Sequence, residues 1–276
     1  MRISVLSGKG GTGKTTVATN LAKTLEYTYI DCDVEEPNGF IFLKPRILDS
    51  KEVNVLVPAV NYDRCTLCGE CVRACQFNAL ANTGKEIVIF EKLCHSCGAC
   101  SLICPENAVD EIPRIIGKID TGKHNEITCI RGVLNIGEPM SGPIISEVKS
   151  MGSGDNAILD CSPGSSCNVV KAIKDTDYAI LVTEPTEFGL HDLKIAVELV
   201  IKMGIPYGVI INRGDEYSHL IEDYCDENNI QLLGNIPFDR RIAKLYSEGR
   251  LLVDDEIYKK VFIKIAQSIE GVVLCN

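Results

Sequence analysis

Apolar and polar positions along the chain form two kinds of segment, short apolar runs and longer stretches with helical spacing. The runs that fit buried strands lie at 2–7, 27–31, 157–161, 178–183, 207–211 and 231–236. The stretches that fit helices lie at 14–25, 187–203, 218–228, 239–249 and about 255–270. Fully apolar strands that alternate with helices are typical of parallel sheets. The sequence therefore predicts an α/β fold, a mostly parallel sheet with helices on both faces.

The middle of the chain breaks this alternation. The β-like stretches there lie at 85–90, 113–119, 126–130 and 133–136. A Gly/Pro-rich bend is expected at 137–143, and residues 108–150 are interpreted as a return path with an extra sheet edge. We therefore predict an α/β domain in two parts, residues 1–60 and 109–276, with a small α+β domain inserted at 61–108.

Composition narrows the function classes. The 276 residues are 45% apolar, enough for a sizeable core, and the net charge of −10 argues against general nucleic-acid binding. No apolar run reaches membrane-spanning length, and the N-terminus leads directly into a glycine loop, unlike a signal peptide. The apolar stripe of the last helix (Ile257, Val261, Ile265, Ile269) favours core packing over membrane binding. We therefore expect a cytoplasmic protein.

Eight of the fourteen cysteines form two matching runs with spacings of two, two and three residues. Two residues between thiolates allow a tight loop to wrap three corners of a [4Fe–4S] cluster, and the fourth cysteine then serves the other cluster. The first predicted ligand set is Cys65, Cys68, Cys71 and Cys104. The second is Cys94, Cys97, Cys100 and Cys75.

The sequence around each run repeats, since Cys-Gly-x-Cys-x3-Cys-x2-Asn-Ala occurs at 68–79 and again at 97–108. This duplication resembles bacterial two-cluster ferredoxins over 61–108. Gln76 stands where that family usually has proline, which affects packing and leaves the ligands unchanged. The alternatives are structural zinc, which is typically held by Cys-x2-Cys pairs with longer spacers, and a disulfide framework.

A glycine-rich loop follows the first apolar run and precedes the first helix. Its sequence fits G-x4-G-K-[ST], in which backbone N–H groups and a helix N-terminus bind phosphate. The residues expected to contact nucleotide are Gly8, Lys9, Gly10, Gly11, Thr12, Gly13, Lys14, Thr15 and Thr16. Lys14 should reach the β- and γ-phosphates, and the Thr15 hydroxyl should bind Mg²⁺. The alternative is a glycine-rich turn without a ligand.

The additional lysine, Lys9, makes this loop resemble the deviant phosphate loop of the ParA, MinD and nitrogenase-iron-protein ATPases. In that family the early lysine reaches the partner's phosphates across a nucleotide-sandwich dimer. The resemblance therefore implies a catalytic role in trans for Lys9, whose alternative is a solvated loop lysine. It also implies an ATP-dependent homodimer, or a heterodimer with a paralogous ATPase.

Two acidic strand ends complete this resemblance. The Asp31-Cys32-Asp33 segment matches switch I, where Asp33 would lie near the attacking water. The apolar run that ends in Asp160, with the Pro163-Gly164 pair that follows it, matches Walker B and switch II. Asp160 would therefore hold Mg²⁺ through water, and the Gly164 N–H would sense the γ-phosphate. Three residues near later strand ends, Asn212, Arg213 and Pro237, match positions that flank the base.

Six cysteines lie outside the two runs: Cys32, Cys129, Cys161, Cys167, Cys225 and Cys275. Three of them (Cys32, Cys161 and Cys167) flank the switch segments, which raises the hypothesis of a third, dimer-bridging cluster. No pair has ligand spacing, and cysteine is often a small buried residue. We favour ordinary packing for these cysteines.

These features predict an ATPase, slow alone and stimulated by a partner, whose dimer state is coupled to electron transfer through two [4Fe–4S] clusters. The partner would be a redox or cluster-acceptor protein. One alternative is an iron–sulfur cluster scaffold or carrier ATPase. Another is a MinD/ParA-like positioning ATPase with a redox-sensing insert.

Overall fold

The computed structural model describes residues 1–152, 154 and 156–273, so Cys275 lies outside the described residues. The chain divides into two compact units. Unit 1 comprises Met1–Ser50, Ile119–Val133 and Ile144–Asn276, and unit 2 comprises Lys51–Lys118 and Leu134–Pro143. Unit 2 thus includes residues 61–108 together with flanking segments on both sides.

Unit 1 is built on a parallel sheet. Its strands are β1 (Arg2–Leu6), β2 (Thr28–Asp31), β7 (Ile127–Leu134), β8 (Ala157–Asp160), β9 (Tyr178–Thr183), β10 (Tyr207–Gly214) and β11 (Leu232–Pro237). They lie in the order β11-β10-β9-β1-β8-β2-β7, and each neighbouring pair is parallel. The predicted α/β class with a mostly parallel sheet is confirmed.

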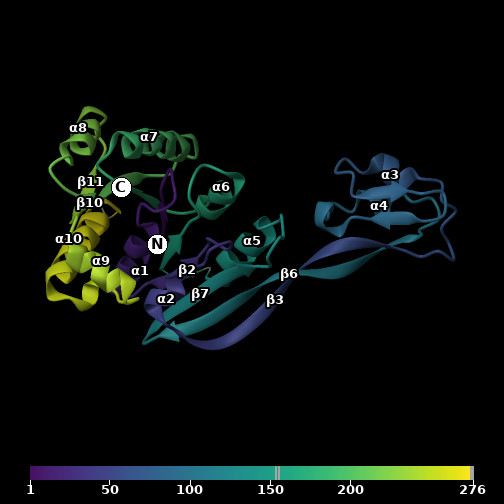
Figure 1. Ribbon diagram of the computed structural model, residues 1–276, viewed down its shortest axis with the longest axis horizontal. Helices are drawn as coiled ribbons and strands as arrows, with labels where there is room; N and C mark the ends of the chain where they lie inside the picture. Colours follow the sequence, from purple (N-terminus) through teal and green to yellow (C-terminus); the bar gives the residue numbers. More distant parts are fainter. Residues whose placement is uncertain (153, 155, 274–276) are drawn as a thin grey trace. The chain divides into compact units, whose positions relative to one another are not determined.

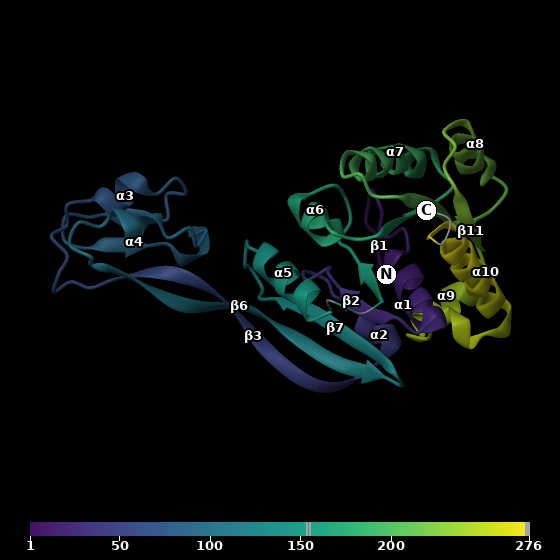
Figure 2. The same ribbon diagram turned by 180° about the vertical axis from the view of Figure 1, so that it is seen from behind.

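Helices cover both faces of this sheet, with α5, α6 and α7 on one side and α1 and α10 on the other (Figures 1 and 2). The helices close to the predicted ranges are α1 (Lys14–Leu25), α7 (Glu187–Lys202), α8 (His219–Glu227), α9 (Arg240–Ser247) and α10 (Glu256–Val273). The unpredicted ones are α2 (Gly39–Leu43), α5 (Gly142–Met151), α6 (Cys167–Ile173) and the 3₁₀ turn η2 (Leu252–Asp254). The sheet therefore lies between two helical layers.

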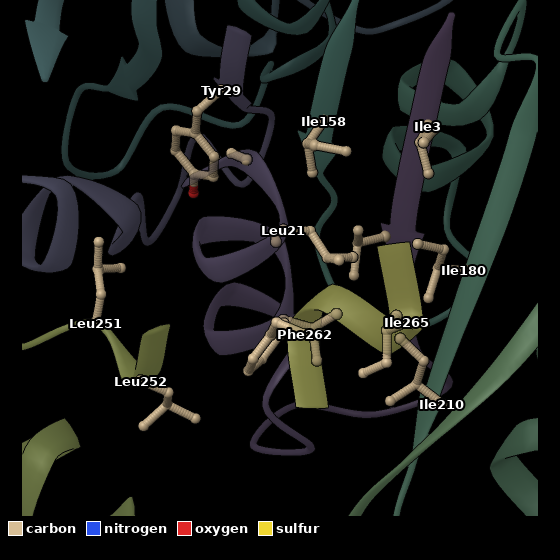
Figure 3. Packing of buried hydrophobic residues seen from close by; sticks show 14 of the residues in the cluster. Ile3, Leu21, Tyr29, Ile158, Ile180, Ile210, Leu251, Leu252, Phe262 and Ile265 are labelled. Carbon is tan, nitrogen blue, oxygen red and sulfur yellow. The ribbon is translucent and has the colours of Figure 1, made fainter. Parts of the chain in front are cut away.

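The core beneath α1 and α10 combines residues from strands and helices that are distant in sequence (Figure 3). Leu21 of α1 and Phe262 and Ile265 of α10 pack with Ile3, Ile158, Ile180 and Ile210 of the strands. On the predicted stripe of α10, Ile265 and Ile269 are buried, Val261 is half-buried and Ile257 is exposed. Most of this stripe packs on the core.

Two long strands carry the chain between the units. The outgoing strand is β3 (Arg46–Val60), and the returning strand is β6 (Val109–His124). The sheet order continues β7-β6-β3, so the two are neighbours. The run predicted at 113–119 is therefore part of a much longer strand. The bend expected at 137–143 ends early, because α5 begins at Gly142.

Unit 2 contains two short helices and a hairpin. The helices are α3 (Glu70–Ala74) and α4 (Ala99–Ile103), the antiparallel hairpin is β4 (Leu80–Asn82) with β5 (Ile87–Ile89), and the 3₁₀ turn η1 (Glu91–Leu93) follows. The two helices begin after equivalent glycines with positive φ, Gly69 and Gly98. The sequence repeat thus corresponds to a structural repeat.

Candidate functional site

The glycine-rich loop connects β1 to α1 at the carboxyl end of the parallel sheet. Gly13 caps α1 with φ of 92°, and a Cβ there would lie 2.2 Å from the Asn212 side-chain nitrogen. That nitrogen donates to the Thr12 carbonyl at 2.7 Å, so β10 holds the loop in place. Lys14 is buried, and its ammonium donates to Ser7 Oγ at 3.0 Å. The loop therefore has a fixed conformation around this lysine.

A cavity of about 420 Å³ opens beside this loop, within the usual size range of small-molecule sites. The predicted site residues that line it are Gly10, Gly11, Gly13, Lys14, Thr15, Thr16, Asp33, Asn212, Arg213 and Pro237. The lining residues that sequence reasoning missed are Glu36, Asn38, Pro163, Phe238, Asp239, Ile242, Ala243 and Tyr246. The amphipathic stretch at 239–249, directly after β11, is the sequence feature from which several of these residues could have been found.

Three acids lie at or just after the ends of β2 and β8, and two of them, Asp33 and Asp160, act on the charge of Lys14. Asp33 accepts a hydrogen bond from Ser162 Oγ at 3.1 Å, which links the segments that follow β2 and β8. Burial raises the pKa of both Asp31 and Asp160, and it lowers the pKa of Lys14 against the opposing effect of Asp160 and Asp33. Such a concentration of buried carboxylates favours binding of a cation.

Two unpartnered polar atoms fit a bound Mg²⁺–nucleotide. Asp160 Oδ1 and Thr12 Oγ1 are buried, and neither has a hydrogen-bond partner among the described residues. Buried polar atoms without partners cost stability, so they are expected where a ligand completes the bonding. Asp160 and Thr15 have the hard oxygen donors that Mg²⁺ prefers. The residues present therefore fit this ligand.

Some groups that were predicted to contact nucleotide phosphates contact other groups of the same chain in this structure. The Gly164 N–H donates to the Ser7 carbonyl at 2.9 Å. The Lys9 ammonium lies 3.9 Å from Glu184, to which Arg213 donates at 2.6 Å. Lys9, Gly164 and Asp160 are not part of the cavity lining described above. Gly8 packs against α7, where a Cβ would lie 2.3 Å from the Asp192 carbonyl oxygen.

In unit 2 the eight cysteines of the two runs gather around two separate cavities. Cys65, Cys68, Cys71 and Cys104 line the first cavity. Cys75, Cys94, Cys97 and Cys100 line the second. Each group takes three cysteines from one run and the fourth from the other, as in the two predicted ligand sets.

Backbone N–H groups point at some of these sulfurs. The Ala79 N–H donates to Cys75 Sγ at 3.3 Å, and the Ala108 N–H donates to Cys104 Sγ at 3.2 Å. Asn78 and Asn107, the residues just before these alanines, have positive φ, which asparagine tolerates better than most residues. The Asn-Ala pair of the repeat therefore forms a turn that directs an N–H to the last cysteine of each run.

Each group supplies four cysteine thiols. A zinc site needs four donors within about 2.3 Å of one ion. A [4Fe–4S] cluster instead binds four cysteine thiolates, one on each iron, so its sulfurs are farther apart. The chemistry of the donor set therefore fits two such clusters.

The described cysteines outside these groups differ in burial. Cys32, Cys129, Cys161 and Cys225 are buried, and burial raises the pKa of each thiol. Cys167 is exposed at the start of α6. The four buried thiols pack as small apolar groups.

A glycine-rich loop at the carboxyl end of a parallel sheet, with acids at the ends of the adjacent strands, defines a P-loop nucleotide-binding protein. Residues 3–253 match the CbiA family, the CobQ/CobB/MinD/ParA nucleotide-binding domain. The chain belongs to this family.

Relatives are similar over most of their length. An uncharacterised protein of Methanocaldococcus jannaschii is 33% identical over 90% of both chains. An iron–sulfur cluster carrier protein of the same organism is 24% identical over 98% of this chain and 85% of its own. The septum site-determining protein MinD of Pyrococcus horikoshii, solved with Mg-ADP, has a TM-score of 0.62 at 23% identity, covering 98% of this chain and 96% of its own. The likeness to MinD shows a common fold.

Among the helices that the structure describes, none combines the length and the apolar composition of a membrane-spanning segment.

Proposed function

We propose that this protein binds and hydrolyses ATP with Mg²⁺, and that the nucleotide state of a dimer controls electron transfer through two [4Fe–4S] clusters. The observation that carries the proposal is the gathering of two cysteine tetrads around separate cavities in the same chain as a P-loop pocket. Bound clusters supply one-electron chemistry. The cysteine tetrads hold them, and β3 and β6 connect their unit to the P-loop unit.

In this proposal each residue of the pocket, and two residues outside its lining, Asp160 and Lys9, has one task. Lys14 binds the β- and γ-phosphates, and Thr15 and Asp160 hold the cation. Asp33 orients the attacking water, and Lys9 leaves Glu184 to reach the phosphates of a partner chain. Turnover is slow alone and increases with a redox or cluster-acceptor protein. The dimer is formed by two copies or with a paralogous ATPase.

Anaerobic purification with iron and sulfide analysis tests the cluster content, which should be about eight iron per chain. Measurement of the protein's molecular size with ATP, with ADP and without nucleotide tests the dimer, which should form only with ATP. An EPR-monitored redox titration then tests the coupling, because the cluster potentials should shift at saturating ATP. Unchanged potentials in a protein that does dimerise would reject the coupling.

A second candidate function is that of a cluster carrier, in which the cluster is cargo. The observation that favours it is the name of several relatives, among them the iron–sulfur cluster carrier proteins of M. jannaschii and Pyrococcus horikoshii. Cys68 and Cys97 are exposed, one in each tetrad. Rapid transfer of clusters to an apo-ferredoxin would support the carrier function, whereas retention of all iron would favour resident clusters.

A further inference from the structure

Tyr29 is a fully buried tyrosine in β2 whose hydroxyl lies between two buried carboxylates. The hydroxyl donates to Asp160 Oδ2 at 2.9 Å and lies 3.1 Å from Asp31 Oδ2. The strands bring these groups together, because Asp31 pairs with Asp160 in the β2–β8 register and Tyr29 lies on the same face of β2 as Asp31. Figure 3 shows the Tyr29 ring at the edge of the packed core, with the hydroxyl oxygen at the end of the side chain away from the backbone.

The surroundings are shaped for this hydroxyl. A Cβ on Gly39 would lie 1.9 Å from the Tyr29 oxygen, so only glycine allows the approach. Phenylalanine would fill the apolar space equally well, without a polar group to bury. Tyr178, another buried tyrosine of the same core, shows the contrast, since its hydroxyl has no hydrogen-bond partner among the described residues.

Through Asp31 the contact extends to the loop that carries Asp33. Asp31 Oδ1 accepts the Asp33 N–H at 3.2 Å, and Asp31 Oδ2 accepts the Gly39 N–H at 3.1 Å. Asp31 therefore fixes both ends of the 33–39 segment.

On the other side, Tyr29 donates to one oxygen of Asp160, and the other oxygen has no hydrogen-bond partner among the described residues. A carboxylate bonded at Oδ2 has a restricted orientation, and its Oδ1 is then available to a ligand. Partners of this kind orient metal ligands and commonly change metal affinity 10–100-fold.

We infer that Tyr29 is a positioning residue, which orients Asp160 for the divalent cation bound with nucleotide and joins it to the Asp33 loop. This inference rests on the proposed function, in which the nucleotide binds with Mg²⁺. Tyr29 touches neither nucleotide nor cation in this arrangement. Its effect is therefore on metal affinity and not on contacts with the nucleotide itself.

The test compares Tyr29→Phe with the matched control Tyr178→Phe in the full-length protein. A fluorescent ATP analogue is titrated in EDTA, and then Mg²⁺ is titrated at saturating analogue; Mn²⁺ EPR reports the metal environment. Tyr29→Phe should bind the analogue in EDTA as the wild type does but require about 10–100-fold more Mg²⁺, with an altered Mn²⁺ signal. Tyr178→Phe should match the wild type in both titrations.

A second variant disrupts the same contact without removing the Tyr29 hydroxyl. Gly39→Ala forces the hydroxyl away and removes no polar group, so it should show the same Mg²⁺ defect. Wild-type Mg²⁺ affinity in Tyr29→Phe would overturn the inference. Loss of analogue binding in EDTA in both variants would also overturn it, because the contact would then be a requirement of the fold. If the wild type itself binds no nucleotide with Mg²⁺, it is the proposed function that fails.

Discussion

The Lys9 ammonium lies 3.9 Å from the Glu184 carboxylate of the same chain. Glu184 also accepts a hydrogen bond from Arg213 at 2.6 Å, so one carboxylate at the end of β9 holds both cations. The sequence predicts that Lys9 acts on the phosphates of a partner chain. In that case the pair with Glu184 must break before the dimer forms, and it opposes association.

Glu184→Gln should therefore strengthen the ATP-dependent dimer. The Lys9–Glu184 pair is long and partly exposed, and such pairs contribute about 0.2–1 kcal/mol each. A dimer of two copies breaks two of them, so its dissociation constant should fall by up to about thirtyfold. Sedimentation velocity with ATP and Mg²⁺ measures this constant. Glu198→Gln, which removes an exposed pair on α7, is the control. A weaker dimer would mean that Glu184 itself contacts the partner.

Lys14→Ala should remove nucleotide binding and leave the iron–sulfur absorbance unchanged. In the proposed function the buried Lys14 ammonium supplies a charged donor to the phosphates, and the loss of such bonds would weaken affinity by about 100-fold or more. The cysteine tetrads lie in unit 2, and Lys14 lies in unit 1. Calorimetry with ATP and visible spectra measure the two effects. Lys23→Ala, on the same helix, should bind nucleotide normally; similar losses in both variants would point to damage to α1.

The parallel sheet was predictable because its strands are apolar along their length and alternate with long amphipathic helices. The strand β3 was missed since its first seven residues, from Arg46 to Glu52, are exposed and carry no apolar alternation. Only later does alternation appear, with Val53, Val55 and Val57 buried. Short helices such as α2 have too few turns to show a period.

The phosphate loop and the cysteine runs were visible as local patterns, since their geometry depends on glycines and spacing. The roles of Tyr29 and Glu184 were not visible. Tyr29 acts on Asp160, 131 residues away, and Glu184 lies 175 positions after Lys9. Only the register of neighbouring strands brings such residues together, and no local pattern records it.

Cys71→Ala should cost the protein about four iron atoms per chain, because Cys71 is the innermost residue of the first tetrad and each cluster needs four thiolates. It is buried within the small core of unit 2. Cys225→Ala, a buried cysteine of α8 in unit 1, should retain all iron. Iron and sulfide analysis of anaerobically prepared protein measures both. Full iron content in Cys71→Ala would show that this thiol is not a ligand.

Arg114 and Glu138 form a two-point ion pair within unit 2, in which Arg114 donates to both carboxylate oxygens. Their side chains are only 14% and 3% exposed. Arg114→Met should leave a buried, unpaired carboxylate and lower the free energy of unfolding by about 3–5 kcal/mol.

The matched control is Arg64→Met, since Arg64 pairs with Asp110 in the same unit with exposures of 42% and 59%. Exposed pairs contribute about 1 kcal/mol or less. Denaturant titration, followed by the loss of cluster absorbance, measures both variants. The double variant Arg114→Met with Glu138→Gln should recover part of the stability, because no unpaired charge remains. Equal losses at both pairs, without such recovery, would mean that water reaches Glu138 and that the Arg114 pair behaves as a surface contact.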